Sequence, residues 1–140
     1  WYQRAAEAGN VKAMHNLAVL SAGRAGEAPD YQTASRWFER AAALGLADSQ
    51  YNLAVLFENG LGVAQDKKRA YQWYALAARS GDKESLRKRD ALRSELSVSE
   101  AAEIDRTITD WRAETSDRLA NDPRAAGEDW KKRQGADANG

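Results

Sequence analysis

Apolar and polar residues follow one another along much of the chain with the three- and four-residue spacing of amphipathic α-helices. One apolar stripe consists of Leu53, Ala54, Leu56 and Phe57. A second stripe, after the loop "ENGLGVAQD", consists of Ala70, Trp73, Tyr74, Ala77 and Ala78. Gly60 and Gly62 give the loop backbone freedom, and Asp66 is a suitable N-cap for the next helix. The pattern predicts two helices joined by a loop, the second running from about Lys67 to Ser80.

This two-helix pattern is repeated. The phrases "WYQRAAEAGN", "WFERAAALGL" and "WYALAARSGD" begin at residues 1, 37 and 73, which are 36 residues apart (37 − 1 = 73 − 37 = 36), and "NLAVL" occurs twice. Each phrase carries a glycine, Gly9, Gly45 or Gly81, where a helix would end in left-handed backbone. A fixed period between about 20 and 50 residues indicates a solenoid of similar units. We therefore predict an all-α fold, an α-α superhelix with a concave groove.

The repeat pattern changes after the third phrase. The next helix, "DKESLRKRDALRSEL", has Lys88 and Arg89 where earlier copies have Asn-Leu, as expected of a terminal unit that no further repeat covers. Ser97, with Glu100 three residues later, predicts a helix start. One face of this helix then carries Ala101, Ile104, Ile108, Trp111 and Leu119. We expect repeats over residues 1–96, the first of them truncated, a long capping helix over residues 97–120, and a polar tail or linker over residues 121–140 with Trp130 as its candidate anchor.

Composition narrows the class of partner. The 140 residues include 21 Lys and Arg against 21 Asp and Glu, so no net field draws the chain to nucleic acid or to an anionic membrane. There is no cysteine for disulfide or thiolate chemistry, and no apolar run approaches the roughly 18 residues that span a bilayer. We expect no nucleic-acid binding and no membrane contact by this fragment. Because Trp1 falls inside a repeat, we expect the fragment to come from a longer protein.

Candidate catalytic residues are few. His15 is the only histidine, so a catalytic triad would depend on it alone, and no multi-histidine metal spacing occurs. "SGDK" at Ser80 fits a Ser-x-x-Lys spacing, but this serine ends a predicted helix instead of starting one, and the partner motifs are missing. "GLG" at residues 60–62 lacks the third glycine of a dinucleotide fingerprint. We expect no enzyme activity, no cofactor and no metal.

The segment "SQYNLAVLFENGLGVAQDKKRAYQWYALAARSGD" resembles the Sel1-like repeat, a relative of the tetratricopeptide repeat. That repeat has Ala, Asn-Leu-Gly, a Tyr, Gly-x-Gly-Val, an acidic residue, Lys-Ala and Ala-Ala-x-x-Gly. The middle copy departs from it at Ser49, Ala54 and Phe57. The first loop, "GRAGEAPDYQTAS", departs further, with Glu27 where the family has Val. The resemblance covers residues 1 to about 82 and implies stacked helix-turn-helix units.

The resemblance also implies recognition of a protein or peptide segment. Related tetratricopeptide domains hold extended peptides on the equivalent face of the first helix of each repeat. If the shared apolar columns pack inward, the positions that face the groove are Lys12, His15, Asn16 and Val19, then Asp48, Tyr51, Asn52 and Val55, then Glu84, Arg87, Lys88 and Ala91. Asn is a poor helix former, so its recurrence at positions 16 and 52 needs a reason beyond helix propensity.

Each of these features also has a structural interpretation. Asn16 and Asn52 would bond a neighbouring backbone and belong to the architecture of the repeat, which is the simpler explanation for a family-wide residue. The aromatic columns Trp37, Phe38, Trp73 and Tyr74 are interpreted as core, and the run Lys67 to Arg69 as a solvated helix start.

The last repeat and the following "ITDWRAE" are similar to the Sel1-repeat region of alphaproteobacterial polar localisation proteins of the PodJ kind. In that group the repeats lie in the periplasm, beyond a single membrane span, and precede a peptidoglycan-binding segment. The resemblance implies a periplasmic, non-catalytic scaffold that recruits proteins at the bacterial envelope, with peptidoglycan contacts through neighbouring modules. The alternative is a regulatory or sensing module that binds cell-wall material or modulates an enzyme.

Overall fold

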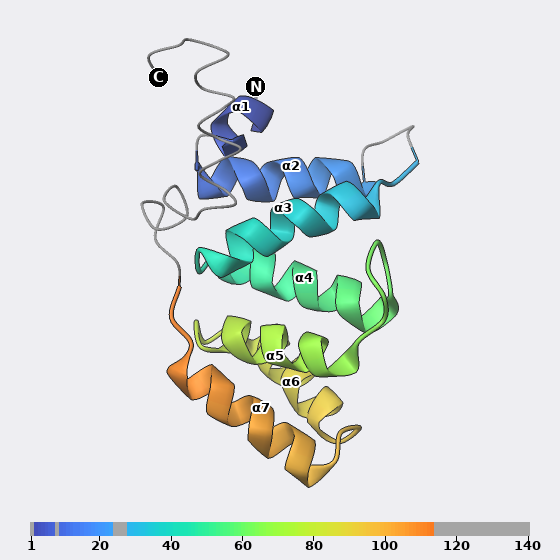
Figure 1. The fold of residues 1–140 in the computed structure, drawn as a ribbon, viewed down its shortest axis with the longest axis vertical. Helices are drawn as coiled ribbons and strands as arrows, with labels where there is room; N and C mark the ends of the chain where they lie inside the picture. The colour runs from blue at the N-terminus through green and yellow to red at the C-terminus, as the bar shows by residue number, and fades with distance from the viewer. Residues whose placement is uncertain (1, 8, 24–27, 114–140) are drawn as a thin grey trace.

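The computed structural model describes residues 2–7, 9–23 and 28–113, and within these ranges it holds seven α-helices and no strand. The helices are α1 (Tyr2–Glu7), α2 (Val11–Gly23), α3 (Tyr31–Ala43), α4 (Ala47–Asn59), α5 (Lys67–Ala78), α6 (Lys83–Arg93) and α7 (Val98–Asp110). They stack along one axis (Figure 1), and each helix from α1 to α5 packs against the next one. The predicted all-α solenoid is confirmed.

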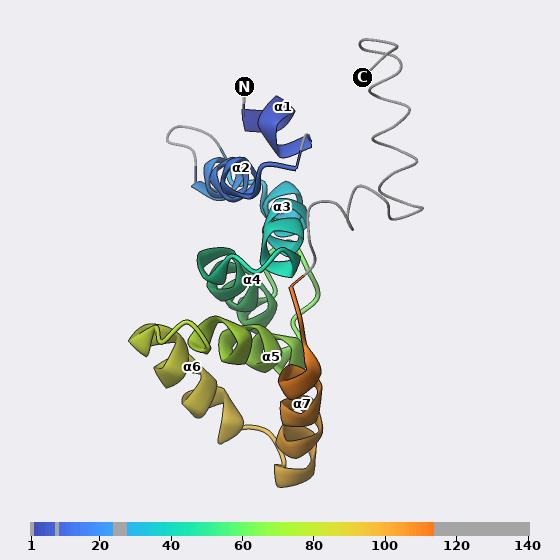
Figure 2. The ribbon, with the colours of Figure 1, turned by 90° about the vertical axis from the view of Figure 1, so that its left-hand side faces the viewer.

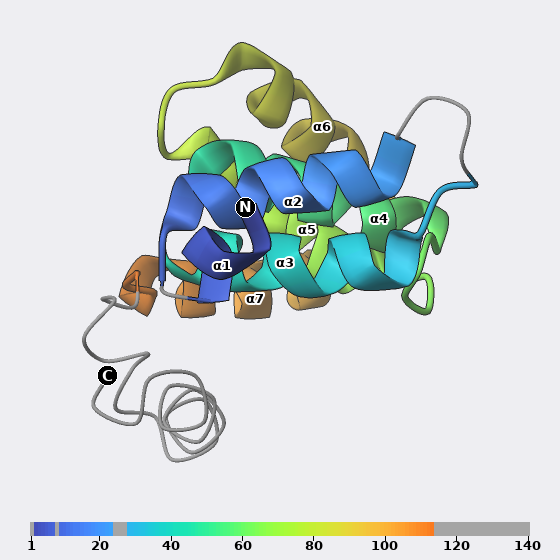
Figure 3. The ribbon, with the colours of Figure 1, turned by 90° about the horizontal axis from the view of Figure 1, so that it is seen from above.

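The helices form two layers. Figure 2 shows α2, α4 and α6 on one side of the stack and α3 and α7 on the other, and the view from above in Figure 3 agrees. The first helices of the units, α2, α4 and α6, begin at Val11, Ala47 and Lys83, which are again 36 residues apart (47 − 11 = 83 − 47 = 36). The sequence period is therefore the structural period.

The helix ends follow from local backbone chemistry. Gly9, Gly45 and Gly81 have φ of +94°, +95° and +91°, the left-handed conformation that the sequence predicts for them. The carboxylate of Asp66 accepts a hydrogen bond from the backbone N–H of Arg69 at the start of α5, which confirms its role as N-cap. These turns join each pair of helices in the same way and so preserve the stacking register.

The core alternates large rings with small side chains. Tyr71, Tyr74 and Leu53 are fully buried, with alanines between them that let the helices approach closely. Phe38 is buried too, as predicted. The prediction that the tryptophans belong to the core is only partly correct, because Trp37 and Trp73 pack against the core but are half-buried. The guanidinium carbon of Arg40 lies 4.9 Å from the centre of the Trp37 ring and covers part of it.

Helix α7 occupies a different place from the predicted cap. It packs against α5 in the second layer, and it begins at Val98, five residues before the repeat period would start that helix (67 + 36 − 98 = 5). The predicted helix start is confirmed, because Ser97 and Glu100 form a reciprocal capping box. Helix α7 is thus the second helix of the third unit, reached through a shorter loop.

The predicted length of this helix is wrong, because α7 ends at Asp110 and Trp111 is extended, with φ −67° and ψ 137°. The backbone N–H of Trp111 donates to the carbonyl of Ile108 at 3.1 Å, and the guanidinium of Arg112 donates to the carbonyl of Trp111 at 2.8 Å. The guanidinium of Arg79 adds longer bonds to the same two carbonyls, at 3.4 and 3.3 Å. The Trp111 ring contacts Trp73 edge-on, with centroids 6.4 Å apart. Leu119 and the predicted tail at 121–140, with Trp130, lie outside the described residues.

Polar contacts join α7 to α5 and α6. The hydroxyl of Tyr71 donates to Asp105 at 2.6 Å and accepts from the guanidinium of Arg93 at 2.7 Å, while Arg93 also pairs with Asp105 at 2.7 Å. Lys68 pairs with Glu100 at 2.8 Å. The pair of Arg93 and Asp105 thus joins the two C-terminal helices of the described chain.

We expect Glu100→Gln to reduce the acid sensitivity of the fold. The ammonium of Lys68, followed by the backbone N–H and hydroxyl of Ser97, lowers the pKa of Glu100 from 4.5 to about 2. A carboxyl group with a lowered pKa stabilises the fold above its unfolded-state pKa, and the contribution is lost as the pH falls through the folded-state pKa. The difference in melting temperature between wild type and variant should therefore shrink between pH 5 and 2.

Glu103→Gln, on the same helix and exposed, is the matched control for this experiment. Glutamine at position 100 preserves the capping box, so α7 itself should remain. If the wild type and Glu100→Gln lost melting temperature in parallel across this range, the contact of Glu100 with Lys68 would not contribute to the stability of the fold.

Candidate partner-binding groove

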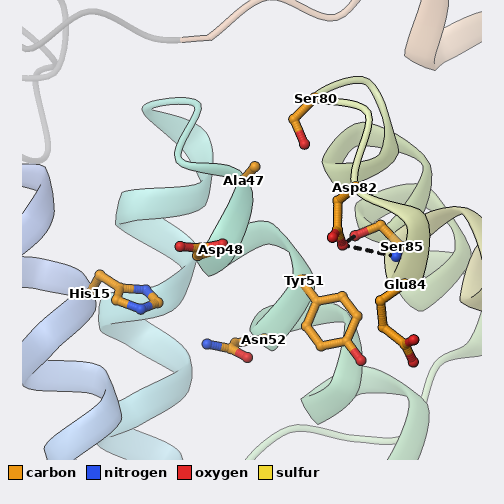
Figure 4. Close-up of a pocket in the computed structure, with 9 residues that line it drawn as sticks. All are labelled: His15, Ala47, Asp48, Tyr51, Asn52, Ser80, Asp82, Glu84 and Ser85. Atoms are coloured by element: carbon orange, nitrogen blue, oxygen red, sulfur yellow. Dashed lines mark hydrogen bonds between the residues drawn. The ribbon is translucent and has the colours of Figure 1, made fainter.

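The first-layer helices enclose a groove of about 370 Å³ (Figure 4). Helix α2 contributes one residue, the N-terminal half of α4 contributes four, and the start of α6 with the preceding turn contributes the rest. The lining residues are His15, Ala47, Asp48, Tyr51, Asn52, Ser80, Asp82, Glu84 and Ser85. The groove therefore spans three successive units of the solenoid.

The structure brings five of the predicted groove residues together: His15, Asp48, Tyr51, Asn52 and Glu84. The others lie on the same three helices but do not line this groove. Of these, Lys12, Asn16, Arg87 and Ala91 are exposed, Val55 and Lys88 are half-buried, and Val19 is 45% exposed. The prediction missed Ala47, Ser80, Asp82 and Ser85. For Ser80, Asp82 and Ser85 the sequence signal, the turn "RSGD" and the residues after it, predicts a helix boundary and does not indicate that these side chains face a groove.

An aromatic pair fixes Tyr51. Its ring meets that of Tyr74 edge-to-face, with centroids 5.4 Å apart. Tyr74 is fully buried, and its hydroxyl donates to Glu58 at 2.7 Å. Burial, then the hydrogen bond to Glu58, raises the pKa of Tyr74, so this hydroxyl remains a donor. Tyr51 is therefore a half-buried ring on a rigid support, with its edge in the groove.

His15 occupies the equivalent position one repeat earlier (15 + 36 = 51), and its ring meets Phe38 at 5.6 Å in the same edge-to-face manner. Its Nδ1 forms a 2.7 Å hydrogen bond with the hydroxyl of buried Ser49, which ties α2 to α4. Burial lowers the pKa of His15, and the nearby carboxylate of Asp48 opposes that shift. His15 thus contributes a largely neutral ring to the groove near pH 7.

The favoured interpretation of the two asparagines is not supported by the structure. Across residues 2–7, 9–23 and 28–113, the side chains of Asn16 and Asn52 form no hydrogen bond with a neighbouring backbone. Asn16 is exposed, and Asn52 is half-buried with its amide directed into the groove (Figure 4). The Asn52 amide keeps its donors and its acceptor for another molecule.

The groove is acidic. Asp48, Asp82 and Glu84 line it, and no Lys or Arg of the described part of the chain does. Asp82 caps α6 by accepting from the backbone N–H and hydroxyl of Ser85 at 2.9 and 2.7 Å, and these bonds lower its pKa. Glu84 pairs with Arg87. Asp48 is exposed and forms no ion pair with any other described residue.

The groove does not assemble a metal site from the residues that the structure describes, since no group of three or more His, Cys, Asp or Glu there could hold an ion. Nor is any helix within those same ranges both long and apolar enough to cross a membrane. What the site offers chemically is a set of hydrogen-bonding groups, a supported aromatic ring and negative charge.

Comparison with known proteins identifies the repeat. The family model of the Sel1 repeat matches residues 1–10, 11–46 and 47–82. A solved Sel1 repeat protein from Oxalobacter formigenes is 34% identical, with a TM-score of 0.61 over 65% of this chain and 68% of that one. A protective antigen of uropathogenic Escherichia coli strains, which displays an SLR fold, has a TM-score of 0.72 at 24% identity over 96% of this chain. This chain covers 27% of the Escherichia coli protein. No curated protein matches it.

Proposed function

Because the chain belongs to the Sel1 repeat family, we propose that it is a non-catalytic interaction module that binds a protein segment in the groove of α2, α4 and α6. Sel1 repeats generally mediate protein–protein interaction, and the proposal assigns that role to one surface. The observation that carries it is that two different groups lie side by side in the groove. The ring of Tyr51 packs edge-to-face on Tyr74, and the amide of the next residue, Asn52, has no hydrogen-bond partner among the described residues. A supported ring and a free amide suit an extended peptide backbone.

The biological setting is a further part of this proposal. The similarity of the last repeat and the "ITDWRAE" segment to polar localisation proteins of the PodJ kind supports a scaffold on the periplasmic side of a bacterial envelope. In that setting the module would recruit other proteins, and neighbouring modules would contact peptidoglycan. A sensing module that binds cell-wall glycan directly would need several aromatic rings in the groove. Among the described residues that line the groove, Tyr51 is the one Tyr, Trp or Phe.

The test is a titration with a captured partner. Proteins retained by the immobilised chain from bacterial envelope extract would be identified and purified, and their affinity for wild type and for Tyr51→Ala/Asn52→Ala would be measured. We expect the double variant to bind about thirtyfold more weakly, or roughly 2 kcal/mol, if these residues are a hot spot. Gln32→Ala/Glu39→Ala, two exposed residues of α3 outside the groove, is the matched control and should bind like wild type.

Melting curves decide how the result is interpreted. The two side chains are half-buried, so the double variant should keep its cooperative unfolding transition. If a folded double variant bound as tightly as wild type, the binding site would lie on the second layer, the loops or α7. If the variant instead lost most of its stability, the pair Tyr51 and Asn52 would belong to the architecture of the repeat.

A further inference from the structure

We propose that the segment bound in this groove is basic: an extended peptide of a partner protein that places a Lys or Arg side chain among Asp48, Asp82 and Glu84. This inference rests on the proposed function and adds the chemical class of the partner. The charge, the shape and the hydrogen-bonding groups of the groove support it.

The negative charge of the groove is local and largely uncompensated. Arg87 pairs with Glu84 and also acts on Asp82, whose hydrogen bonds come from neutral groups. Asp48 has no ion pair within the described ranges, so one base faces three acids. The whole chain carries 21 basic and 21 acidic side chains, so its net field would not attract a cationic peptide. Attraction of such a peptide would therefore come from the groove itself.

Helix capping explains only part of this charge. Asp82 caps α6 and is needed there, since its carboxylate accepts from the backbone of Ser85. Asp48, in the first turn of α4, forms no such bond with a described residue, and the equivalent position in α2 is Lys12 (48 − 36 = 12). Helix α2 thus forms with a base where α4 has an acid. Asp48 is therefore not required by the repeat, and its charge is available to a ligand.

The groove can also hold the rest of such a residue. The ring of Tyr51 lies on the same wall as Asp48 and can support the aliphatic stem or the cationic head of Lys or Arg. The amide of Asn52, one residue further along α4, can pair with the backbone of the peptide, which fixes its direction. Asp48 and Tyr51 would therefore bind the basic side chain, and Asn52 would bind the peptide backbone.

The test uses three fluorescein-labelled decapeptides of alternating Lys-Thr, Gln-Thr and Glu-Thr, which differ in charge but share an extended preference. Binding to the full chain would be followed by fluorescence anisotropy at constant ionic strength. We expect the Lys-Thr peptide to bind about tenfold more tightly than the Gln-Thr peptide, and the Glu-Thr peptide to bind most weakly. Equal affinity for the three peptides would overturn the inference.

Single substitutions then place the charge. Asp48→Asn should weaken the Lys-Thr peptide about threefold and Asp48→Lys about tenfold, whereas Glu39→Gln, which removes an exposed carboxylate from α3, should leave it unchanged. Equal weakening by Asp48→Asn and Glu39→Gln would show non-specific attraction and overturn the inference. The inference would also be overturned if the chain self-associated and Asp48→Lys abolished that self-association, because the occupant of the groove would then be a second copy.

The two proposals fail in different ways. If Tyr51→Ala/Asn52→Ala weakens the captured partner while the three peptides bind alike, the groove is the binding site but its occupant is not chosen by charge. If the double variant leaves the partner unaffected, the groove is not the binding site, whatever the peptides do.

Discussion

Gly62→Ala should destabilise the protein by about 3 kcal/mol, although Gly62 is exposed. Its φ is +72°, where a Cβ is costly, and a Cβ built there would lie 2.3 Å from the backbone carbonyl carbon and oxygen of Tyr31. The loop between α4 and α5 thus lies in close backbone contact with the start of α3, in the preceding unit. Because the added Cβ would meet backbone atoms, no flexible side chain could move aside to relieve the overlap. The measurement is the free energy of unfolding from urea denaturation.

Gly81→Ala separates the two causes of this effect. Gly81 also has a positive φ, +91°, but a Cβ there would meet nothing within 4 Å. We expect Gly81→Ala to cost about 1 kcal/mol, from the backbone conformation alone. If both variants lost the same free energy, the loop would not lie in close backbone contact with α3 in solution, and the spacing between the first two units would need another explanation.

A chain that ends at Leu96 should be less stable by about 3 kcal/mol than one that ends at Ala113. The shorter chain loses α7, and with it the burial of Ala101, the packing of Ile104 against the main core and the bond between Tyr71 and Asp105. Because both chains lack residues 114–140, the comparison isolates α7 and Trp111. We expect a lower melting temperature and more binding of a hydrophobic dye by the shorter chain.

Equal melting temperatures for the two chains would contradict the role of α7 as the second helix of the third unit. The helix would then be an appendage whose contacts with α5 cost as much as they contribute. The result bears on function too, since α6 carries one wall of the groove and packs on the same α5.

The sequence was sufficient for the features that depend on local chemistry. The 36-residue period, the left-handed Gly9, Gly45 and Gly81, and the caps at Asp66 and Ser97 are all encoded within a few residues of where they act. The end of α7 was beyond such reasoning, because the residues there contact Trp73 and Arg79, which are distant in the sequence. An apolar stripe shows only where a helix can continue.

The groove divides along the same line. Helical spacing was enough to place His15, Asp48, Tyr51, Asn52 and Glu84 on one face, because they sit at equivalent positions of stacked helices. Asp82, Ser80 and Ser85 were missed because they face the groove only once α6 has packed beside α4 through α5. Only the structure could show that the amide of Asn52 is unbonded, since a repeated asparagine looks the same in sequence whether it bonds its own backbone or a partner.

The surface that binds the partner is measured most directly by amide chemical shifts of the ¹⁵N-labelled chain as the captured protein is added. We expect the largest changes on residues 47–55 of α4 and on residues 80–88 around the start of α6, with His15 also shifting. Exposed residues of α3, such as Gln32 and Glu39, should keep their positions. Shifts confined to α3, α5 and α7, with α4 and α6 unchanged, would contradict the groove as the binding site.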